Sequence, residues 1–170
     1  PIDVTARTPG RPLRVLVDER AESVVVVAED GAVHYLWRGE DSDFLPRQSF
    51  RPFADAAAPA IAGCDWLFGH ESLIITAPTG VQHRYSLCKE GDEPRKFQRT
   101  GTFPPLPGTP GPMAVSARNR SYLTTSGAHI SLRFGTTVSE RWTGALPAPA
   151  QALTINAKND RIAVLSSAGL

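Results

Sequence analysis

The four histidines of the chain are the side chains best suited to acid–base chemistry or to metal binding. His34, His70, His83 and His129 are scattered along the sequence, and they do not recur at one position of the repeat described below. His34 and His129 lie in stretches where apolar and polar residues alternate, which is the pattern of a half-buried strand. We interpret the histidines as surface residues or hydrogen-bonded strand residues, and not as a catalytic group.

The other motifs that carry chemistry are missing or incomplete. The sequence contains no G-x-S-x-G nucleophile elbow, no phosphate-binding loop and no dinucleotide-binding fingerprint, and turn chemistry explains Thr125-Ser126-Gly127. The acidic run Glu40-Asp41-Ser42-Asp43 resembles part of a calcium loop but lacks the later glycine and the bidentate glutamate, so we interpret it as a solvated loop. We therefore predict no catalytic, cofactor-binding or metal-binding residue, no cofactor and no enzymatic activity.

Composition and charge narrow the class of partner. Lys and Arg number 18 and Asp and Glu number 17, which leaves a net charge of +1. A nucleic-acid-binding protein usually carries a clear basic excess, so we expect no nucleic-acid partner. The hydrophobic share of 41% is typical of a globular domain and too high for a disordered chain.

The two cysteines, Cys64 and Cys88, lack the spacing of a zinc site and have no suitable histidines near them in the sequence. A disulfide between them would require an oxidising compartment, and the alternative is two small, half-buried apolar residues. An anion site would need a nest of backbone N–H groups or converging arginines. Arg118 and Arg120 are close in sequence, but they lie in a predicted hairpin turn and we expect them to be solvated.

The three tryptophans, Trp37, Trp66 and Trp142, are expected to fill the space between repeated units. The alternative is an aromatic platform for a peptide or a sugar, which would require a cluster of exposed tryptophans.

A repeat organises the whole chain. Four segments, each with an apolar or β-branched stretch followed by small or polar residues, align without gaps on a glycine. The glycines are Gly31, Gly80, Gly127 and Gly169, spaced 49, 47 and 42 residues apart. This period is typical of a propeller blade of about 40 to 50 residues, and it is too long for leucine-rich or ankyrin repeats.

Each unit is expected to be a four-stranded antiparallel meander whose central turn carries the glycine. First strands are predicted at 13–17, 65–68, 113–116 and 153–156, third strands at 32–37, 81–87 and 128–134, and fourth strands near 47–50, 96–99 and 138–142. Pro- and Gly-rich stretches at 103–112 and 146–150 are expected to link the units, and 53–62 reads as an irregular link.

The sequence therefore predicts an all-β fold of β-propeller-type blades, three complete and part of a fourth. We expect one partial propeller domain over 1–170, with blades at about 11–52, 61–103 and 111–145 and an incomplete one at 151–170. Because propellers usually need four to eight blades to close, we expect open strand edges, with either a self-associating arc or two copies that complete a ring. The missing initiator methionine and the end within a predicted strand lead us to expect a piece of a longer protein.

One region resembles a known family. Pro1-Ile2-Asp3-Val4 leading to Arg11-Pro12-Leu13, then a strand and Asp30-Gly31-Ala32-Val33, resembles the soluble domain of long-form permease subunits of bacterial phosphate-type ABC transporters. That domain is inserted after the first membrane helix. The resemblance implies a non-catalytic domain on the periplasmic face of the inner membrane. It also implies contact with other transporter subunits or the substrate-binding protein, and attachment to the membrane through parts of the protein outside this sequence.

Two other functions remain open. The first is a soluble propeller scaffold of the WD or quinoprotein type that contacts protein partners, although the WD dipeptide and its accompanying Gly-His are missing from this sequence. The second is a propeller hydrolase such as a lactonase or glycosidase, whose polar residues would line a central channel.

Overall fold

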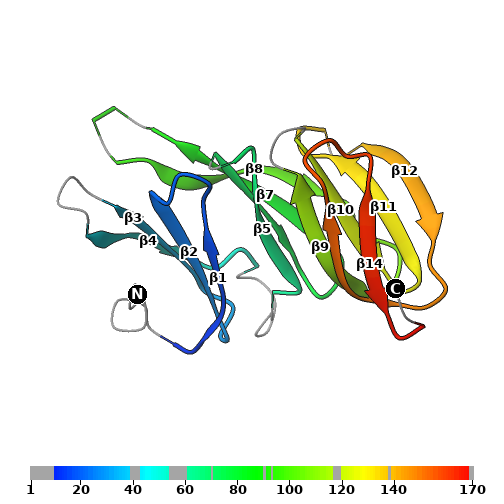
Figure 1. Cartoon of the computed structure of the whole chain (residues 1–170). Coiled ribbons are helices and arrows are strands. Elements are labelled where there is room, and N and C mark those ends of the chain that lie inside the picture. Colours follow the sequence, from blue (N-terminus) through cyan, green and yellow to red (C-terminus); the bar gives the residue numbers. More distant parts are fainter. Residues whose placement is uncertain are drawn as a thin grey trace.

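A computed structural model of the chain describes residues 10–38, 43–53, 61–69, 71–89, 91–92, 94–116, 120–137 and 139–168. Within these residues the structure contains fourteen strands and no helix (Figure 1). Every sheet is antiparallel, and its strands pair in the order in which they follow one another along the chain.

Three sheets have four strands and one has two. The first sheet contains β1 (Pro12–Val17), β2 (Ser23–Ala28), β3 (Val33–Arg38) and β4 (Phe44–Phe50). The second contains β5 (Gly63–Leu67), β6 (Ser72–Thr76), β7 (Gln82–Cys88) and β8 (Lys96–Phe103). The third contains β9 (Pro110–Ser116), β10 (Ser121–Ser126), β11 (His129–Phe134) and β12 (Glu140–Ala145). The fourth contains β13 (Ala150–Ile155) and β14 (Ile162–Ser166).

The predicted meander units are confirmed, and their glycines occupy the predicted turn. Gly31, Gly80 and Gly127 lie between the second and third strands of their sheets with φ angles of 80°, 85° and 54°. L-residues with a side chain rarely adopt such angles, which explains the glycine at the same place in each unit. Gly169, the fourth glycine of the repeat, lies outside the described residues. The outer strands β4, β8 and β12 extend beyond the ranges expected from the sequence.

The sheets stand side by side in a row, so that successive sheets bury the side chains between them (Figure 1). Alternation along β2 turns Val25 and Val27 toward the second sheet, where they share a buried cluster with Leu73 and Ile75. Val24 and Val26 of the same strand face the opposite way and belong to a separate cluster. All six residues of β2 are buried, so this strand is covered on both faces.

The second and third junctions between sheets are also packed with buried apolar side chains. Leu67 and Ile74 of the second sheet cluster with Tyr122 of the third, and Leu123 of the third clusters with Ile155 of the fourth. The core of this protein is thus a series of sheet-to-sheet contacts, and each sheet after the first packs on the sheet before it.

Hydrogen bonds between side chains and backbone fasten neighbouring sheets. Gln48 of β4 donates to the carbonyl of Phe97 in β8 at 3.0 Å, and the Phe97 N–H donates back to Gln48 Oε1 at 2.7 Å. Arg84 of β7 donates to the carbonyls of Gly135 and Thr136 in the third sheet at 3.1 and 2.7 Å. These bonds tie the first sheet to the second and the second sheet to the third.

The row is open at both sides. On the first sheet, Val15 and Val17 of β1 pair with Val26 and Val24 on the face turned away from the second sheet, and both are exposed. At the other side, β14 pairs with β13 alone among the described strands, and its Leu165 is exposed. The structure thus shows three blades and part of a fourth in an arc that does not close.

Candidate functional site

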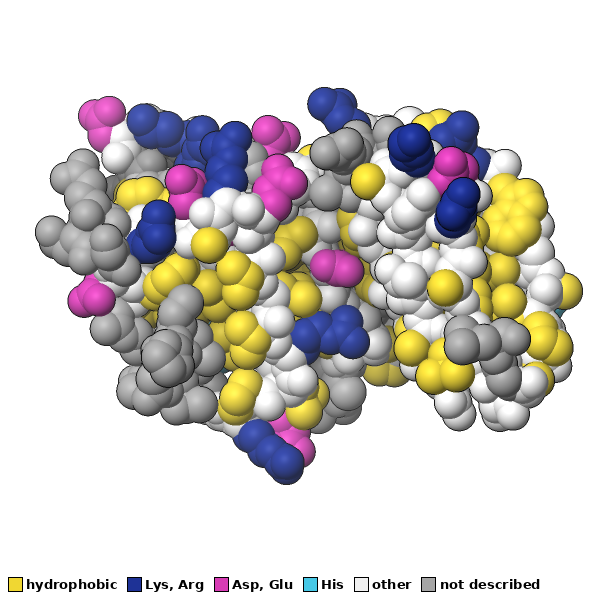
Figure 2. Space-filling view, in the orientation of Figure 1, with side chains coloured by type: hydrophobic (Ala, Val, Ile, Leu, Met, Phe, Trp, Pro, Cys, Tyr) yellow, Lys and Arg dark blue, Asp and Glu magenta, His cyan; other side chains and the backbone are white. Residues whose placement is uncertain are grey.

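Charged side chains gather at one end of the row. The turns between first and second strands and between third and fourth strands all lie at this end, which we call the upper end because it is uppermost in Figure 1. Figure 2 shows Lys and Arg side chains concentrated along its border, with a few acidic side chains among them. The opposite, lower end carries the glycine turns. The upper end also contains three pockets, one at each junction between sheets.

The first junction pocket lies between the first and second sheets and has a volume of about 620 Å³. This size is within the usual range of ligand pockets. Its cationic residues are Arg20 from the β1–β2 turn, Arg47 from β4, and Lys89 and Arg95 from the two ends of the β7–β8 loop. Its lining also includes the acidic residues Glu22 and Asp92. Among the described residues, then, four cations and two carboxylates border one space.

Aromatic rings form the floor and one wall of the first junction pocket. The Arg47 guanidinium stacks over the Trp37 ring, 5.0 Å from its centroid. Tyr35 lies beneath them, buried, with its ring in an edge-on contact 5.0 Å from that of Phe97. Burial raises the pKa of the Tyr35 phenol, and Arg47 and Arg95 act in the opposite direction, so both cations lie within electrostatic reach of its hydroxyl.

The second junction pocket, between the second and third sheets, has a volume of about 510 Å³. Its cations are Arg84, Lys89, Arg95 and Arg120, and its one described acid is Glu71. The Arg120 guanidinium lies 5.5 Å from the centroid of the Phe68 ring. Lys89 and Arg95 border the first pocket as well, so the β7–β8 loop separates two pockets that share its charges.

The third junction pocket, about 480 Å³, lies between the third sheet and the two-stranded fourth sheet. Leu132, Arg141 and Trp142 line it from the third sheet, and Lys158 and Asn159 from the β13–β14 turn. The same combination therefore recurs three times at the upper end: an aromatic ring beside at least two cations. Such a combination suits a partner that carries carboxylates next to apolar or aromatic side chains.

The expectation that all three tryptophans fill the core is wrong for two of them. Trp66 is 7% exposed and belongs to the core between the first and second sheets, whereas Trp37 is 37% and Trp142 is 49% exposed. Trp37 stands near the upper end of β3, where the Arg47 guanidinium lies over its ring and the first junction pocket leaves part of it open. Trp142 lies on the outer strand β12, and the described part of the sheet that it faces has two strands only. The two exposed tryptophans occupy separate pockets.

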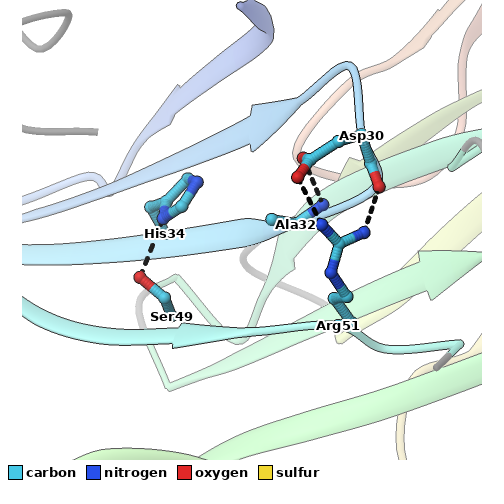
Figure 3. Close-up of polar contacts among 5 residues, drawn as sticks. All are labelled: Asp30, Ala32, His34, Ser49 and Arg51. Carbon is cyan, nitrogen blue, oxygen red and sulfur yellow. Dashed lines mark hydrogen bonds and ion pairs between the residues drawn. The ribbon is translucent and has the colours of Figure 1, made fainter. Parts of the chain in front are cut away.

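The histidines do not form a site. His34 is buried on β3 and its Nδ1 shares a 2.8 Å hydrogen bond with Ser49 Oγ (Figure 3). His83 is buried on β7, with Nδ1 2.9 Å from the carbonyl of Pro52, and burial lowers the pKa of its imidazole. His129 is exposed, and His70 lies outside the described residues. Within the described ranges, no three His, Cys, Asp or Glu residues lie close enough to hold a metal ion.

Figure 3 also shows an ion pair at the lower end of the first sheet. Arg51 bonds to the carboxylate and the carbonyl of Asp30, and the Ala32 N–H donates to the same carboxylate at 3.0 Å. The bond from Ala32, followed by Arg51, keeps the pKa of the Asp30 carboxyl below its usual range. The pair holds the glycine turn against the end of β4. Because both side chains are about half exposed, it adds little to the stability of the fold.

The remaining sequence candidates have structural roles or lie outside the described residues. Cys64 is buried, Cys88 is half-buried, and both thiols are free. Ser126, the last residue of β10, donates its hydroxyl hydrogen to the carbonyl of Pro107 in the link between β8 and β9. Arg120 is exposed next to the Phe68 ring, while Arg118 and the residues 40–42 of the acidic run are not described.

Sequence reasoning missed the convergence of Arg20, Arg47 and Arg95. They are far apart in the chain, and only the stacking of one blade on the next brings them to one pocket. A signal was available, since residues at the ends of strands that precede or follow upper-end turns must gather at one end of the molecule. Counting the charged residues in and beside each predicted upper-end turn would have found these arginines.

Comparison with solved structures finds a similar protein, the β-propeller domain of Cps50 (Swd1) from Myceliophteria thermophila. The TM-score is 0.64, and the alignment covers 90% of this chain and 47% of that one. The chain has a β-propeller-type fold. At 9% sequence identity the likeness concerns the fold alone, and the chain spans about half the length of that propeller.

No family model matches the chain, and no curated protein matches its sequence. The comparisons therefore support the propeller part of the resemblance drawn from the opening residues, and they do not address the permease part. In the described residues, no helix has the length and apolar character needed to cross a membrane.

Proposed function

We propose that this chain is part of a non-catalytic protein-interaction scaffold, and that its upper end binds acidic segments of partner proteins. The observation that carries this proposal is the recurrence of an aromatic ring beside two or more cations in each of the three junction pockets. Eight Lys and Arg residues line these three pockets, although the net charge of the whole chain is only +1.

The charge is placed where a partner can reach it. Arg20, Lys89, Arg95 and Lys158 are exposed, and they belong to turns, which tolerate sequence change better than strands do. Grouped positive potential speeds the approach of an acidic partner and favours it over neutral ones. Cations outnumber acids among the described residues of the upper end. Four acids of the same loops are not described: Glu40, Asp41, Glu90 and Glu93.

The test is a binding titration with a defined probe, a fluorescein-labelled peptide of glutamates interrupted by single leucines. We expect binding that weakens as the ionic strength rises from about 0.01 M to about 0.15 M, which shortens the screening length from roughly 30 Å to roughly 8 Å. The double variant Arg20→Glu/Lys89→Glu should lose at least about ten-fold in affinity, because each reversal removes an attraction and adds a repulsion.

The matched control is Arg11→Glu/Arg99→Glu, which changes the net charge equally with two exposed residues away from the upper-end turns. It should change affinity by less than about two-fold. Equal losses in both variants would refute the upper end as the binding face. Tighter binding of a single-stranded DNA of equal charge than of the peptide would replace the protein partner with a nucleic acid.

A second feature supports a scaffold that is completed by further blades. The chain covers about half of a similar propeller, and both sides of its row expose apolar residues, Val15 and Val17 on one side and Leu165 on the other. We propose that two copies associate through these sides. Light scattering behind size-exclusion chromatography should then show a dimer, and a charge change on the exposed valine face, Val15→Lys, should return it to a monomer. A monomer at high concentration in the unchanged chain would refute self-association.

The transporter hypothesis remains a proposal with its own test. The resemblance of the opening residues implies a periplasmic domain of a permease, and membrane helices in the full-length gene on both sides of this sequence would support it. A full-length gene without membrane helices would refute it.

A further inference from the structure

The first junction pocket has a floor of buried aromatic and hydrogen-bonded residues. Its floor is the buried Tyr35, held by the edge-on contact with Phe97 and by a hydrogen bond of 3.3 Å between its hydroxyl and Ser23 Oγ. Beside it, Gln48 makes two hydrogen bonds with the Phe97 backbone, which lock the outer strands of the two sheets together. These contacts fasten the floor of the pocket to both sheets.

One wall presents the half-buried side chain of Arg47. The Arg47 guanidinium stacks on Trp37, and its Nε is buried without a hydrogen-bond partner among the described residues. That buried Nε has almost no accessible surface, so what Arg47 offers a ligand is the positive charge of its half-buried guanidinium. Arg20, Lys89 and Arg95 line the same pocket. With Arg47 they outnumber its two described carboxylates, Glu22 and Asp92, so this lining favours an anionic acceptor.

The other wall is apolar. Trp37 keeps 37% of its surface exposed although a cation stacks on it, and Pro94 lines the pocket as well. An exposed tryptophan next to a converging set of cations can bury an apolar side chain of a ligand while the cations bind its carboxylate.

We infer that the first junction pocket is the anchor point of the interface, and that it takes an Asp or Glu side chain of a partner protein together with the apolar residue beside it. This inference rests on the proposed function and deepens it. The carboxylate pairs with Arg47 and Arg95, and the neighbouring apolar side chain lies against Trp37. The second and third pockets then add charge attraction without setting which residue is recognised.

The experiment compares two peptide probes and two sets of variants. The first probe is a labelled ten-residue peptide of glutamates with one central leucine, and the second replaces the leucine by serine. Because the apolar side chain is part of the recognised unit, the serine peptide should bind about ten-fold more weakly to the unchanged chain. Trp37→Ala should lower affinity for the leucine peptide by about the same factor and remove the difference between the two peptides.

Two further variants test the carboxylate. Arg47→Gln keeps an N–H donor near the position of Nε but removes the charge and the end of the guanidinium, and should cost about ten-fold in affinity. Arg95→Gln changes an exposed residue, so its loss of affinity keeps the test valid if Arg47→Gln disturbs the fold. Trp142→Ala and Arg141→Gln are the matched controls in the third pocket, and each should change affinity by less than about two-fold.

The outcomes separate the anchor from the general function. If the leucine peptide binds and responds to charge reversal at the upper end, but Trp37→Ala and Arg47→Gln act no more strongly than their third-pocket controls, the anchor is refuted and the proposed function stands. If the leucine peptide does not bind the unchanged chain at low ionic strength, the proposed function itself fails. Equal binding of the leucine and serine peptides also refutes the anchor, because it shows recognition of charge alone.

Discussion

Replacing Gly80 by alanine is expected to destabilise the chain more than the same change at Gly127, although the two glycines occupy the same position of the repeat. Both have a positive φ, 85° and 54°. The left-handed conformation costs an L-residue roughly 1–2 kcal/mol, and both variants incur this cost.

The difference arises from what the new methyl group would meet. At Gly80 a Cβ would lie 2.8 Å from the backbone nitrogen of Leu106 and 3.0 Å from its carbonyl oxygen, and at Gly127 nothing lies within 4 Å. The Leu106 N–H donates to the Gly80 carbonyl at 3.0 Å, so the link between β8 and β9 is fastened against this turn and cannot move away freely. Forcing a methyl group into filled space adds about 1–3 kcal/mol.

We therefore expect a loss of roughly 2–5 kcal/mol in unfolding free energy for Gly80→Ala and roughly 1–2 kcal/mol for Gly127→Ala. Urea denaturation followed by circular dichroism, with linear extrapolation to water, measures both losses. A difference smaller than about 0.5 kcal/mol between the two variants would refute the reasoning, since it would mean that the turn and the link do not touch as described.

Three further predictions concern buried groups. The Tyr122 hydroxyl donates to Gln82 Oε1 at 2.9 Å between two fully buried side chains, so Tyr122→Phe should lower the unfolding free energy by about 1–3 kcal/mol in urea denaturation, and an unchanged value would contradict that bond. Burial raises the pKa of Tyr85 and Tyr122 above the ordinary value of 10.0, so the folded chain holds these protons more tightly than the unfolded chain. The contribution of these two tyrosines to the unfolding free energy should therefore be constant below about pH 10 and should fall as the pH rises further. Melting temperatures measured across the alkaline range test this. Burial also raises the pKa of the Cys64 thiol to about 12, so a thiol reagent at neutral pH should modify the half-buried Cys88 first, and equal rates would contradict the placement of Cys64.

Much of the fold could be predicted from local pattern. The turn glycines need a conformation that other residues avoid, and alternating apolar residues need a buried face, so both leave a signal in a single stretch of sequence. The sheets, their order and the three complete blades follow from these two signals. The link predicted at 103–112 was recognisable only in part. Residues 104–109 connect β8 to β9, but Pro110 and Pro112 lie in β9, an edge strand, where proline is tolerated.

The candidate site could not be predicted in the same way, because it is formed across sheets. Trp37 and Trp142 lie in strands whose pattern resembles that of core residues, and their exposure depends on what the neighbouring sheet places opposite them. The approach of Arg47 to Trp37 follows a register shift in the β3–β4 pairing between Tyr35 and Leu36, which the sequence pattern does not reveal. Arg118 and Arg120 stand out in the sequence because they are close together in the chain, whereas the arginines that converge are far apart.

The most direct test of the account is a nuclear magnetic resonance titration of the isotopically labelled chain with the acidic leucine peptide, observing the three tryptophan indole N–H signals. If the upper end binds acidic segments and the first junction pocket anchors them, the Trp37 signal should shift most, and the Trp142 signal less. The signal of Trp66, which is buried in the core, should stay in place. A titration in which the Trp37 signal stays in place while backbone signals shift at the lower-end turns of Gly31, Gly80 and Gly127 would contradict the account.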